Sequence, residues 1–228
     1  LDETGAKMVQ SALEARGAEF FLSDSVLRFE GNTAYLKSGK KVEFDLLVIA
    51  VGVRPNTELI KEAGGTVRRG IAVDECGRTS LPDIFAAGDC AESFDIASGT
   101  NRVLALLPNA AFQGRAAGVN MAGGKATLDN AVAFNSIGFF GTHVMTAGVY
   151  EGELYCERTE RTYKALFTKD GLLKGFILIN LPERAGIYLK LLKERIPLGA
   201  VDFQALKTSP AWSAFSPEAR ADNFAREV

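Results

Sequence analysis

The sequence predicts an α/β region followed by a small α+β domain, and three patterns predict it. Residues 45–52 form a continuously apolar run after Asp45, and residues 83–89 hold a second apolar run between two aspartates, which is typical of strands buried on both faces of a parallel sheet. A helical pattern of small and apolar residues follows at 108–124. Farther along, residues 162–180 alternate between apolar and polar on both sides of a Lys-Asp-Gly turn, which is typical of an antiparallel hairpin.

The start of the chain predicts a helix and then strands. An amphipathic helix is expected at residues 3–16, and Gly17 ends it. Residues 18–31 and 33–45 are expected as strands, the second of them folded back at a Ser38-Gly39 turn. A short helix and a short strand then lead to the second apolar run.

The helix expected from Pro108 ends at a pair of glycines, and the pattern changes after it. Its expected packing face carries Ala111, Phe112, Arg115, Ala116 and Val119. The segment 125–134 has the composition of a joint, so we expect one domain at 1–124 and another at 125–228.

The second domain is expected to be an antiparallel sheet of a few strands backed by helices. Residues 181–196 have the periodicity of an amphipathic helix. Two Ser-Pro pairs, Ser209-Pro210 and Ser216-Pro217, predict further helix starts, because proline is well suited to the first helical position.

Composition and charge argue against two classes of partner. The 228 residues, 47% of them hydrophobic and 24% charged, are ordinary for one large or two modest globular domains. The net charge of −2, without a basic run, argues against nucleic-acid binding. No apolar run reaches the ~18 residues that a membrane span needs, so no membrane partner is expected.

The cysteines do not predict a metal site. Cys76, Cys90 and Cys156 are widely spaced, and His143 is the one histidine of the sequence. This arrangement has none of the short Cys and His spacings of metal centres, so we expect no metal. Scattered thiols suit a reducing compartment, which predicts a cytoplasmic protein.

Asp89 is the first candidate for chemistry. It ends the second apolar run, and ligands of open α/β sheets bind beyond the carboxyl ends of strands. Gly88 lets the backbone come close to a ligand there, and a carboxylate accepts hydrogen bonds from ligand hydroxyls. Alternatively, Asp89 caps a helix beginning at Cys90, and the residues by themselves leave both readings open.

Two further features are candidates for anion or cofactor contacts. The start of the helix at Asn109 offers free N–H groups and a partial positive charge, although an ordinary surface helix would look the same. The first apolar run ends in Gly52, which permits a tight crossing, and Arg54 follows. Arg54 could meet a phosphate or a carboxylate, or it could remain solvated.

Three stretches carry a family resemblance: LLVIAVGVRPNTEL, TSLPDIFAAGDCAE and PNAAFQGRAAGVNMAGG. In this order and spacing they resemble the pyridine nucleotide-disulfide oxidoreductase family, whose members are FAD-dependent enzymes that take hydride from NAD(P)H. The resemblance covers residues 1–124. It implies that this region is part of an FAD/NAD(P)-binding Rossmann-like fold, with FAD as cofactor and NAD(P)H as co-substrate.

The resemblance also implies roles for individual residues. By it, Asp89 binds the ribityl chain of FAD, and Gly88 permits the approach. A turn that runs beside the cofactor is matched by Ala50, Val51 and Gly52, with Val51 where the family usually has Thr.

A third part of the implied site is the start of the helix at 108–124. Pro108, Asn109 and Ala110 match the family's helix start that faces the pyrimidine edge of the flavin. A helix amino terminus in that place stabilises negative charge on the cofactor.

One family feature does not occur in this sequence. The motif G-x-G-x-x-G, which members use for the pyrophosphates of FAD and NAD, is absent. Family members carry it, and the redox-active cysteines where they have them, before the motifs seen here. We therefore expect a C-terminal fragment that is inactive alone, with catalytic residues upstream of Leu1.

The region after 124 resembles the last domain of nitrite reductase flavin modules and rubredoxin reductase-like proteins. The leading hypothesis is thus an FAD-dependent oxidoreductase that passes electrons from NAD(P)H through flavin to an acceptor, with an electron-acceptor protein as partner. One alternative is a thiol-disulfide or CoA-disulfide reductase of the same family. Another is a non-enzymatic module that self-associates, as a homodimer, through the apolar C-terminal domain.

Overall fold

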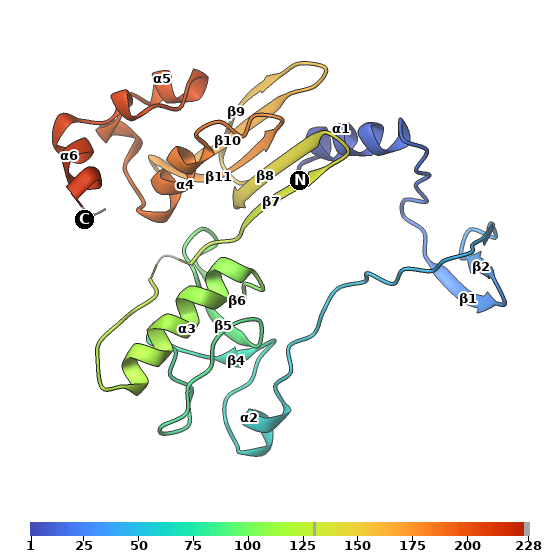
Figure 1. Ribbon diagram of the computed structural model, residues 1–228, viewed down its shortest axis with the longest axis horizontal. Helices are drawn as coiled ribbons and strands as arrows, with labels where there is room; N and C mark the ends of the chain where they lie inside the picture. The colour runs from blue at the N-terminus through green and yellow to red at the C-terminus, as the bar shows by residue number, and fades with distance from the viewer. Residues whose placement is uncertain (130, 226–228) are drawn as a thin grey trace. The chain divides into compact units, whose positions relative to one another are not determined.

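The computed structural model describes residues 1–129 and 131–225, and the chain forms two compact units. One unit is Lys7–Arg54, and the other combines Leu1–Ala6 with Pro55–Val228. Figure 1 shows the order of the elements along the chain. The mixture of helices, a partly parallel sheet and an antiparallel sheet confirms the expected fold class. The boundary at 124/125 stays a prediction.

The smaller unit holds most of α1 (Glu3–Glu14) and a three-stranded antiparallel sheet. Its strands are β1 (Val26–Glu30), β2 (Thr33–Leu36) and β3 (Lys41–Glu43), in that order across the sheet. The turn between β2 and β3 contains Gly39 at φ 88°, as the Ser38-Gly39 prediction requires. Of the strand expected at 18–31, five residues form β1, and residues 18–25 lie outside regular structure.

The strand expected at 45–52 does not form. Residues 44–54 have no regular secondary structure, and their apolar side chains lie in solvent, with Leu46 81% and Val51 91% exposed. A strand buried on both faces needs paired neighbours and covering layers. The described residues of this unit supply neither, so both the strand and its burial were predicted wrongly.

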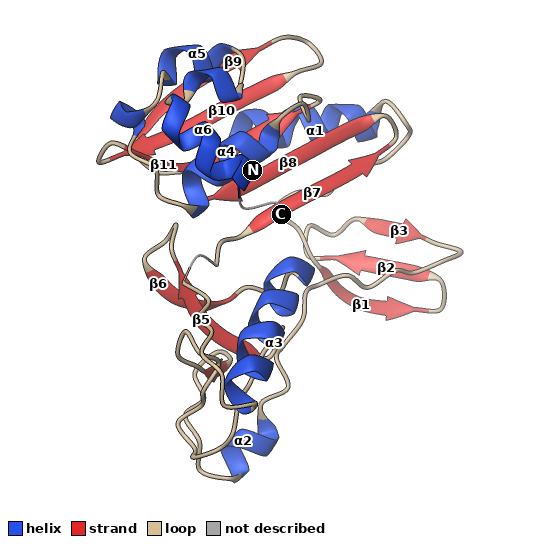
Figure 2. Cartoon of the chain, turned by 60° about the vertical axis from the view of Figure 1, so that its left-hand side comes forward, coloured by secondary structure: helices blue, strands red, loops and turns tan. Residues whose placement is uncertain are grey.

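The larger unit begins with α2 (Glu58–Glu62) and a small mixed sheet. In that sheet β4 (Ile71–Ala72) pairs in parallel with β5 (Ala91–Asp95), which pairs antiparallel with β6 (Thr100–Val103). Figure 2 shows α3 (Leu107–Met121) lying beside this sheet.

The strand expected at 83–89 is also wrong. This stretch is a series of turns in which Phe85 makes one isolated bridge to Arg78. Asp83 and Gly88 both have positive φ, at 61° and 83°, which a regular strand cannot accommodate. The buried strand of this region is instead β5, which begins after the turn and which the sequence patterns did not reveal.

A five-stranded antiparallel sheet dominates the rest of the larger unit, in the order β7-β8-β11-β10-β9. Its members are β7 (Phe134–Phe139), β8 (Thr142–Gly148), β9 (Glu153–Arg158), β10 (Tyr163–Lys169) and β11 (Leu172–Ile179). The hairpin expected at 162–180 is confirmed as β10 and β11, with Asp170 and Gly171 at positive φ in its turn.

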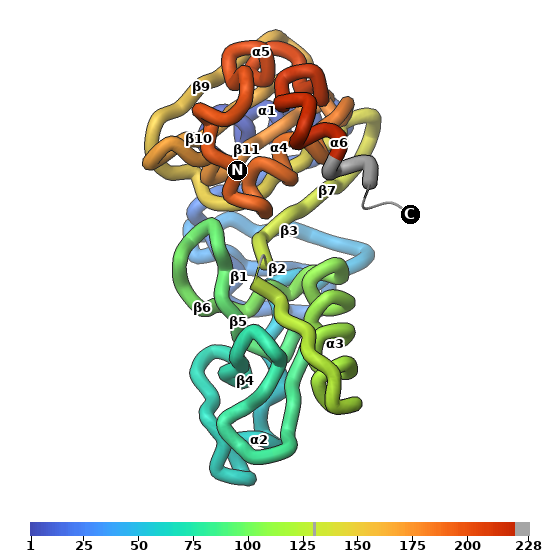
Figure 3. The backbone as a smooth tube through the Cα atoms, turned by 90° about the vertical axis from the view of Figure 1, so that its left-hand side faces the viewer, coloured from blue at the N-terminus to red at the C-terminus, as the bar shows by residue number. Residues whose placement is uncertain are grey.

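Both faces of this sheet are covered. The α4 helix (Ala185–Lys193) packs on one face through its buried Ile187, Leu191 and Leu192, as its periodicity predicts. On the other face, Gly5 of the amino-terminal segment lies against Ile177. Figure 3 shows the carboxyl-terminal helices gathered over the sheet.

The carboxyl-terminal segment confirms one of the two Ser-Pro predictions. Ser216-Pro217 begins α6 (Pro217–Ala225), whereas Ser209-Pro210 precedes a single 3₁₀ turn at Trp212–Ala214. The helix before that turn, α5 (Phe203–Thr208), is started by Asp202, whose side chain accepts from the Ala205 N–H. Leu206 and Phe215 anchor this segment in the core against Tyr188.

Candidate cofactor site

The turn at Gly88 and Asp89 is the first part of the candidate site. Gly88 has φ 83°, a left-handed conformation that glycine adopts without steric cost. Its carbonyl accepts from the Ala91 N–H at 2.9 Å, so the turn closes directly onto the start of β5. No helix begins at Cys90, and the alternative in which Asp89 caps such a helix is therefore wrong.

The Asp89 side chain is exposed. Within the described part of the chain its carboxylate has neither a hydrogen-bond donor nor a cation as partner. Asp89 therefore follows a turn rather than a strand, and its carboxylate is available to a ligand.

The start of α3 is the second part. Leu106 precedes the helix without a side-chain cap, and Pro108 lies in the first turn. Pro108 has no N–H, and the Ala110 N–H donates to the Leu106 carbonyl at 3.0 Å, so the N–H groups of Leu107 and Asn109 are those left in the first turn to donate to a ligand. The Asn109 side chain is buried and donates to the Val132 carbonyl at 3.0 Å, so that its amide is engaged within the fold.

The structure brings these two parts together. A Cβ placed on Gly88 would lie 3.6 Å from the Cβ of Ala110, which is ordinary van der Waals contact. Gly88, Asp89 and the residues Pro108–Ala110 therefore share one location, as the resemblance implies. They come from two segments about twenty residues apart, joined through β5 and β6.

The buried face of α3 differs from the expected one. Phe112 is 47% exposed and Val119 is 37% exposed, while the helix buries Asn109, Gln113, Ala116, Ala117 and Asn120. Irregular segments with unpaired backbone groups lie against this face, and amide side chains can satisfy them where aliphatic ones cannot.

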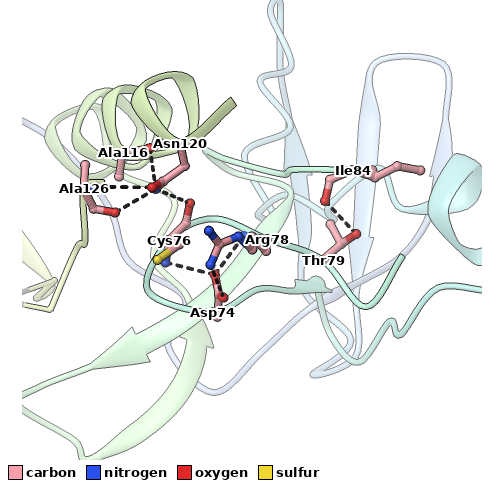
Figure 4. Close-up of polar contacts among 8 residues, drawn as sticks. All are labelled: Asp74, Cys76, Arg78, Thr79, Ile84, Ala116, Asn120 and Ala126. Atoms are coloured by element: carbon pink, nitrogen blue, oxygen red, sulfur yellow. Dashed lines mark hydrogen bonds and ion pairs between the residues drawn. The ribbon is translucent and has the colours of Figure 1, made fainter. Parts of the chain in front are cut away.

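Asn120 shows how the amides work. Its Nδ2 donates to the carbonyls of Cys76, Ala116 and Ala126, at 3.0, 2.8 and 2.7 Å, and its Oδ1 accepts from the Ala126 N–H (Figure 4). The neighbouring turn is closed by Asp74, whose carboxylate accepts from the Cys76 and Arg78 N–H groups. One side chain thus holds two loops to the helix.

Gln113 makes the corresponding contacts beside the candidate site. Its Oε1 accepts from the Gly88 N–H at 2.7 Å, and its Nε2 donates to the Ser93 hydroxyl at 2.9 Å. Sequence reasoning missed this residue. The signal was present, because Asn109, Gln113 and Asn120 recur at helical spacing on one face.

A buried carboxylate on β5 fixes the strand that follows the turn. Glu92 is 5% exposed, and its Oε2 accepts from the N–H groups of Arg69 and Gly70, both at 3.1 Å. Arg68 pairs with the other oxygen at 3.3 Å. With its hydrogen bonds satisfied and a cation beside it, this carboxylate is a structural group.

The third expected part of the site lies in the other unit. Ala50, Val51 and Gly52 belong to the irregular segment 44–54 and are exposed, as is Arg54. Gly52 has φ 101°, so the turn geometry that glycine permits is present. A place for these three residues beside the cofactor stays a prediction.

The remaining candidate groups have ordinary surroundings. His143 Nε2 lies 2.9 Å from the Ser136 hydroxyl, and the three cysteines are free thiols. Among residues 1–129 and 131–225, no three His, Cys, Asp or Glu side chains gather as they would around a metal ion. No described helix has the length and apolar character to cross a bilayer.

Comparison with known proteins places the chain. Residues 1–114 match the sequence pattern of the family described as pyridine nucleotide-disulphide oxidoreductase. The chain belongs to this family. This match confirms the resemblance seen in the three motifs. The enzymes of the pyridine nucleotide-disulphide oxidoreductase family use FAD and NAD(P)H.

Curated relatives extend the match into the carboxyl-terminal region. The chain is 33% identical over 210 residues to the NADH-dependent phenylglyoxylate dehydrogenase subunit epsilon of Aromatoleum evansii, covering 86% of this chain and 50% of that protein. It is 32% identical over 207 residues to the assimilatory nitrate reductase electron transfer subunit of Bacillus subtilis, covering 86% and 26%. The chain thus spans half the length of the first relative and about a quarter of the second.

Solved structures show the same fold. An FAD-dependent pyridine nucleotide-disulphide oxidoreductase from Desulfovibrio vulgaris aligns with a TM-score of 0.81 at 24% identity, covering 91% of this chain and 58% of that one. The covalent putidaredoxin reductase-putidaredoxin complex aligns with a TM-score of 0.78 at 21% identity, covering 90% of this chain and 53% of that one. At these identities the likeness establishes the fold.

Proposed function

We propose that this chain forms the ribityl and pyrimidine side of the FAD site of an oxidoreductase, which passes electrons from NAD(P)H to an acceptor. The observation that carries the proposal is the contact between the Gly88-Asp89 turn and the start of α3. It puts a carboxylate without a protein partner beside an uncapped helix amino terminus.

The chemistry of these groups fits the two ends of a flavin. The Asp89 carboxylate accepts hydrogen bonds, and the ribityl chain presents hydroxyl donors. The first-turn N–H groups of α3 and the positive end of its dipole favour a group that carries negative charge. Gly88 adopts φ 83°, a conformation that L side chains rarely adopt, so the shape of the turn that carries Asp89 depends on glycine at this position.

FAD, when bound, supplies the acceptance of hydride from NAD(P)H and the release of electrons to the acceptor. The protein's own groups then have two tasks. Asp89 and α3 bind and orient the cofactor, and the partial positive charge at α3 stabilises it more strongly as it gains negative charge. We place Ala50, Val51 and Gly52 along the same cofactor.

The acceptor is proposed to be a protein or metal centre of an electron-transfer partner. Relatives support this by their names, which include an electron transfer subunit and the rubredoxin-NAD(+) reductase of Pseudomonas putida. The putidaredoxin reductase neighbour was solved in a complex with putidaredoxin. We place the protein in the cytoplasm, since its thiols are free.

We also propose that NAD(P)H oxidation needs residues other than these 228. The sequence contains no G-x-G-x-x-G loop, whose N–H groups would hold a dinucleotide pyrophosphate. NADH oxidation by the 228-residue chain supplied with FAD and ferricyanide would contradict this part of the proposal.

Asp89→Asn tests the cofactor assignment, in the protein produced from its full natural reading frame. The variant removes the charge and keeps the shape, so FAD binding is expected to weaken by about 1.5–3 kcal/mol. Flavin fluorescence during titration of the apoprotein measures this.

Asp83→Asn is the matched control, because Asp83 is another exposed aspartate of the same loop, six residues earlier. The assignment fails if the two variants bind FAD equally well, or if the wild-type protein binds none.

A further inference from the structure

Gln113 is a buried amide whose two ends are both used. It lies in the second turn of α3 and is 5% exposed. Burial of an unpaired amide would be costly, and here the oxygen accepts from Gly88 while the nitrogen donates to Ser93, which is 6% exposed. The two partners lie before and within β5, so one side chain spans the whole turn that carries Asp89.

The contact to Gly88 is the one that fixes the turn on the helix. Gly88 has a freely adaptable backbone, and glycine by itself does not select φ 83° over other conformations. The 2.7 Å bond from its N–H to Gln113 supplies that selection. On the helix, Gln113 is four residues after Asn109, so the two side chains share one face of α3, and Gln113 reaches the turn from that face.

The consequence concerns the relative position of two groups. Asp89 follows Gly88 directly, and the helix start lies one turn before Gln113. The distance between the carboxylate and the first N–H groups of α3 therefore depends on the Gln113 bridge. Both groups belong to the proposed flavin site, where Asp89 would bind the ribityl chain and the start of α3 would face the pyrimidine edge.

We propose that Gln113 is a positioning residue of the flavin site, which holds the Asp89 carboxylate and the amino terminus of α3 in register. Gln113 does not touch the cofactor, and it acts through the Gly88 backbone. This inference rests on the proposed function for its consequence, while the bridge itself is a property of the fold.

The neighbouring amide Asn120 provides the control. It lies on the same buried face at 9% exposure and makes four hydrogen bonds, all to the segments around Cys76, Ala116 and Ala126. A loss of Asn120 perturbs the same helix without removing a contact to Gly88.

The experiment compares Gln113→Met, Gln113→Glu and Asn120→Leu with wild type, in the protein from its full reading frame. Hydrogen exchange of the Gly88 amide, read by NMR, reports the bridge directly, and fluorescence titration with FAD reports the site. Gln113→Met removes both polar ends, so exchange at Gly88 is expected to quicken about 5- to 150-fold, with a comparable loss of FAD affinity.

The other two variants are expected to behave differently. Gln113→Glu keeps an acceptor for the Gly88 N–H and should restore most of its protection. Asn120→Leu should leave Gly88 exchange within about twofold of wild type, although the protein is destabilised.

Three results would overturn the proposal. In the first, Gly88 exchange is unchanged in Gln113→Met. In the second, Asn120→Leu accelerates it equally. In the third, Gln113→Met frees Gly88 while FAD affinity stays at the wild-type value. If wild type itself binds no FAD, the proposed function fails, and Gly88 exchange alone decides whether Gln113 holds the turn.

Discussion

Glu157, on β9, lies between a phenol and an ammonium group. The Tyr155 hydroxyl donates to one carboxylate oxygen, and Lys164 Nζ lies 2.9 Å from the other. The hydrogen bond from Tyr155, followed by the one from Lys164, lowers the pKa of Glu157. The same bond from Tyr155, now favouring the protonated phenol, raises the pKa of Tyr155 to about 12.

These two pKa shifts act on stability at opposite ends of the pH scale. Glu157 has a lower pKa in the folded state, so its contribution is present above its ordinary value of 4.5 and is lost as pH falls through the folded value. Tyr155 has a raised pKa, so its contribution is present below 10 and is lost as pH rises toward about 12.

Tyr155→Phe is expected to raise the pKa of Glu157 toward its ordinary value, because the larger of the two hydrogen bonds is removed. Carboxyl ¹³C chemical shifts of Glu157 followed through an acid titration measure the change. Tyr150→Phe is the matched control, since the ring centroid of Tyr150 lies 5.1 Å from that of Phe167, and Tyr150 makes no hydrogen bond to Glu157. An unchanged titration of Glu157 in Tyr155→Phe would show that Lys164 alone lowers its pKa.

Lys164 also joins two elements, because its ammonium group reaches from β10 to the end of α5. Its side chain is 7% exposed, and Nζ donates to the carbonyls of Lys207 and Thr208 at 2.7 and 3.0 Å. The last carbonyls of a helix have no partner within the helix. Lys164 therefore completes the carboxyl end of α5 and holds it to the sheet.

Lys164→Met is expected to lower the free energy of unfolding by about 1–3 kcal/mol, since it leaves two partly buried carbonyls unpaired and removes the cation beside Glu157. Urea unfolding, monitored by circular dichroism, measures the loss. Lys169→Met is the control: that side chain is 52% exposed and lies 3.7 Å from Glu151, so its removal should cost less than about 0.5 kcal/mol. Equal losses would show that the bonds to α5 contribute nothing.

The elements also show what the sequence could predict. Local patterns were sufficient for α4 and the β10-β11 hairpin, because each buries one regular face against its neighbours. The apolar runs at 45–52 and 83–89 were misleading for two reasons. The described residues provide no paired strands for the first, and positive φ values at Asp83 and Gly88 turn the chain in the second. The α3 helix was predicted, but of its expected packing face only Ala116 is buried, because the helix packs through three amides and two alanines.

The site was predictable to the same extent. The motifs placed Gly88 and Asp89 with Pro108–Ala110, and the structure brings these together. The helical spacing of Asn109, Gln113 and Asn120 marks a polar face on α3, but the specific role of Gln113 depends on the conformation of Gly88, which no local pattern specifies.

At the scale of the whole chain, the segment 44–54 is a highly accessible apolar stretch. Leu46, Val48 and Val51 are 81%, 76% and 91% exposed, and the segment ends where one compact unit meets the other in sequence. Its backbone belongs to no described helix or strand. Such a segment opens to a protease at low free-energy cost, while the strands around Leu166 and Ile177 open only with the core.

Brief treatment of the 228-residue chain with thermolysin, which cleaves before aliphatic residues, is expected to cut first within 46–53. Mass spectrometry of the products identifies the bond.

In the protein from its full reading frame, FAD is expected to slow that cut, because the proposed function puts Ala50, Val51 and Gly52 along the cofactor. Cleavage at an added flexible tag, measured in the same tube, controls for inhibition of the protease. A first cut in the five-stranded sheet would contradict the exposure of 44–54, whereas an FAD-independent rate at 46–53 would remove these three residues from the proposed site and leave Asp89 and α3 in it.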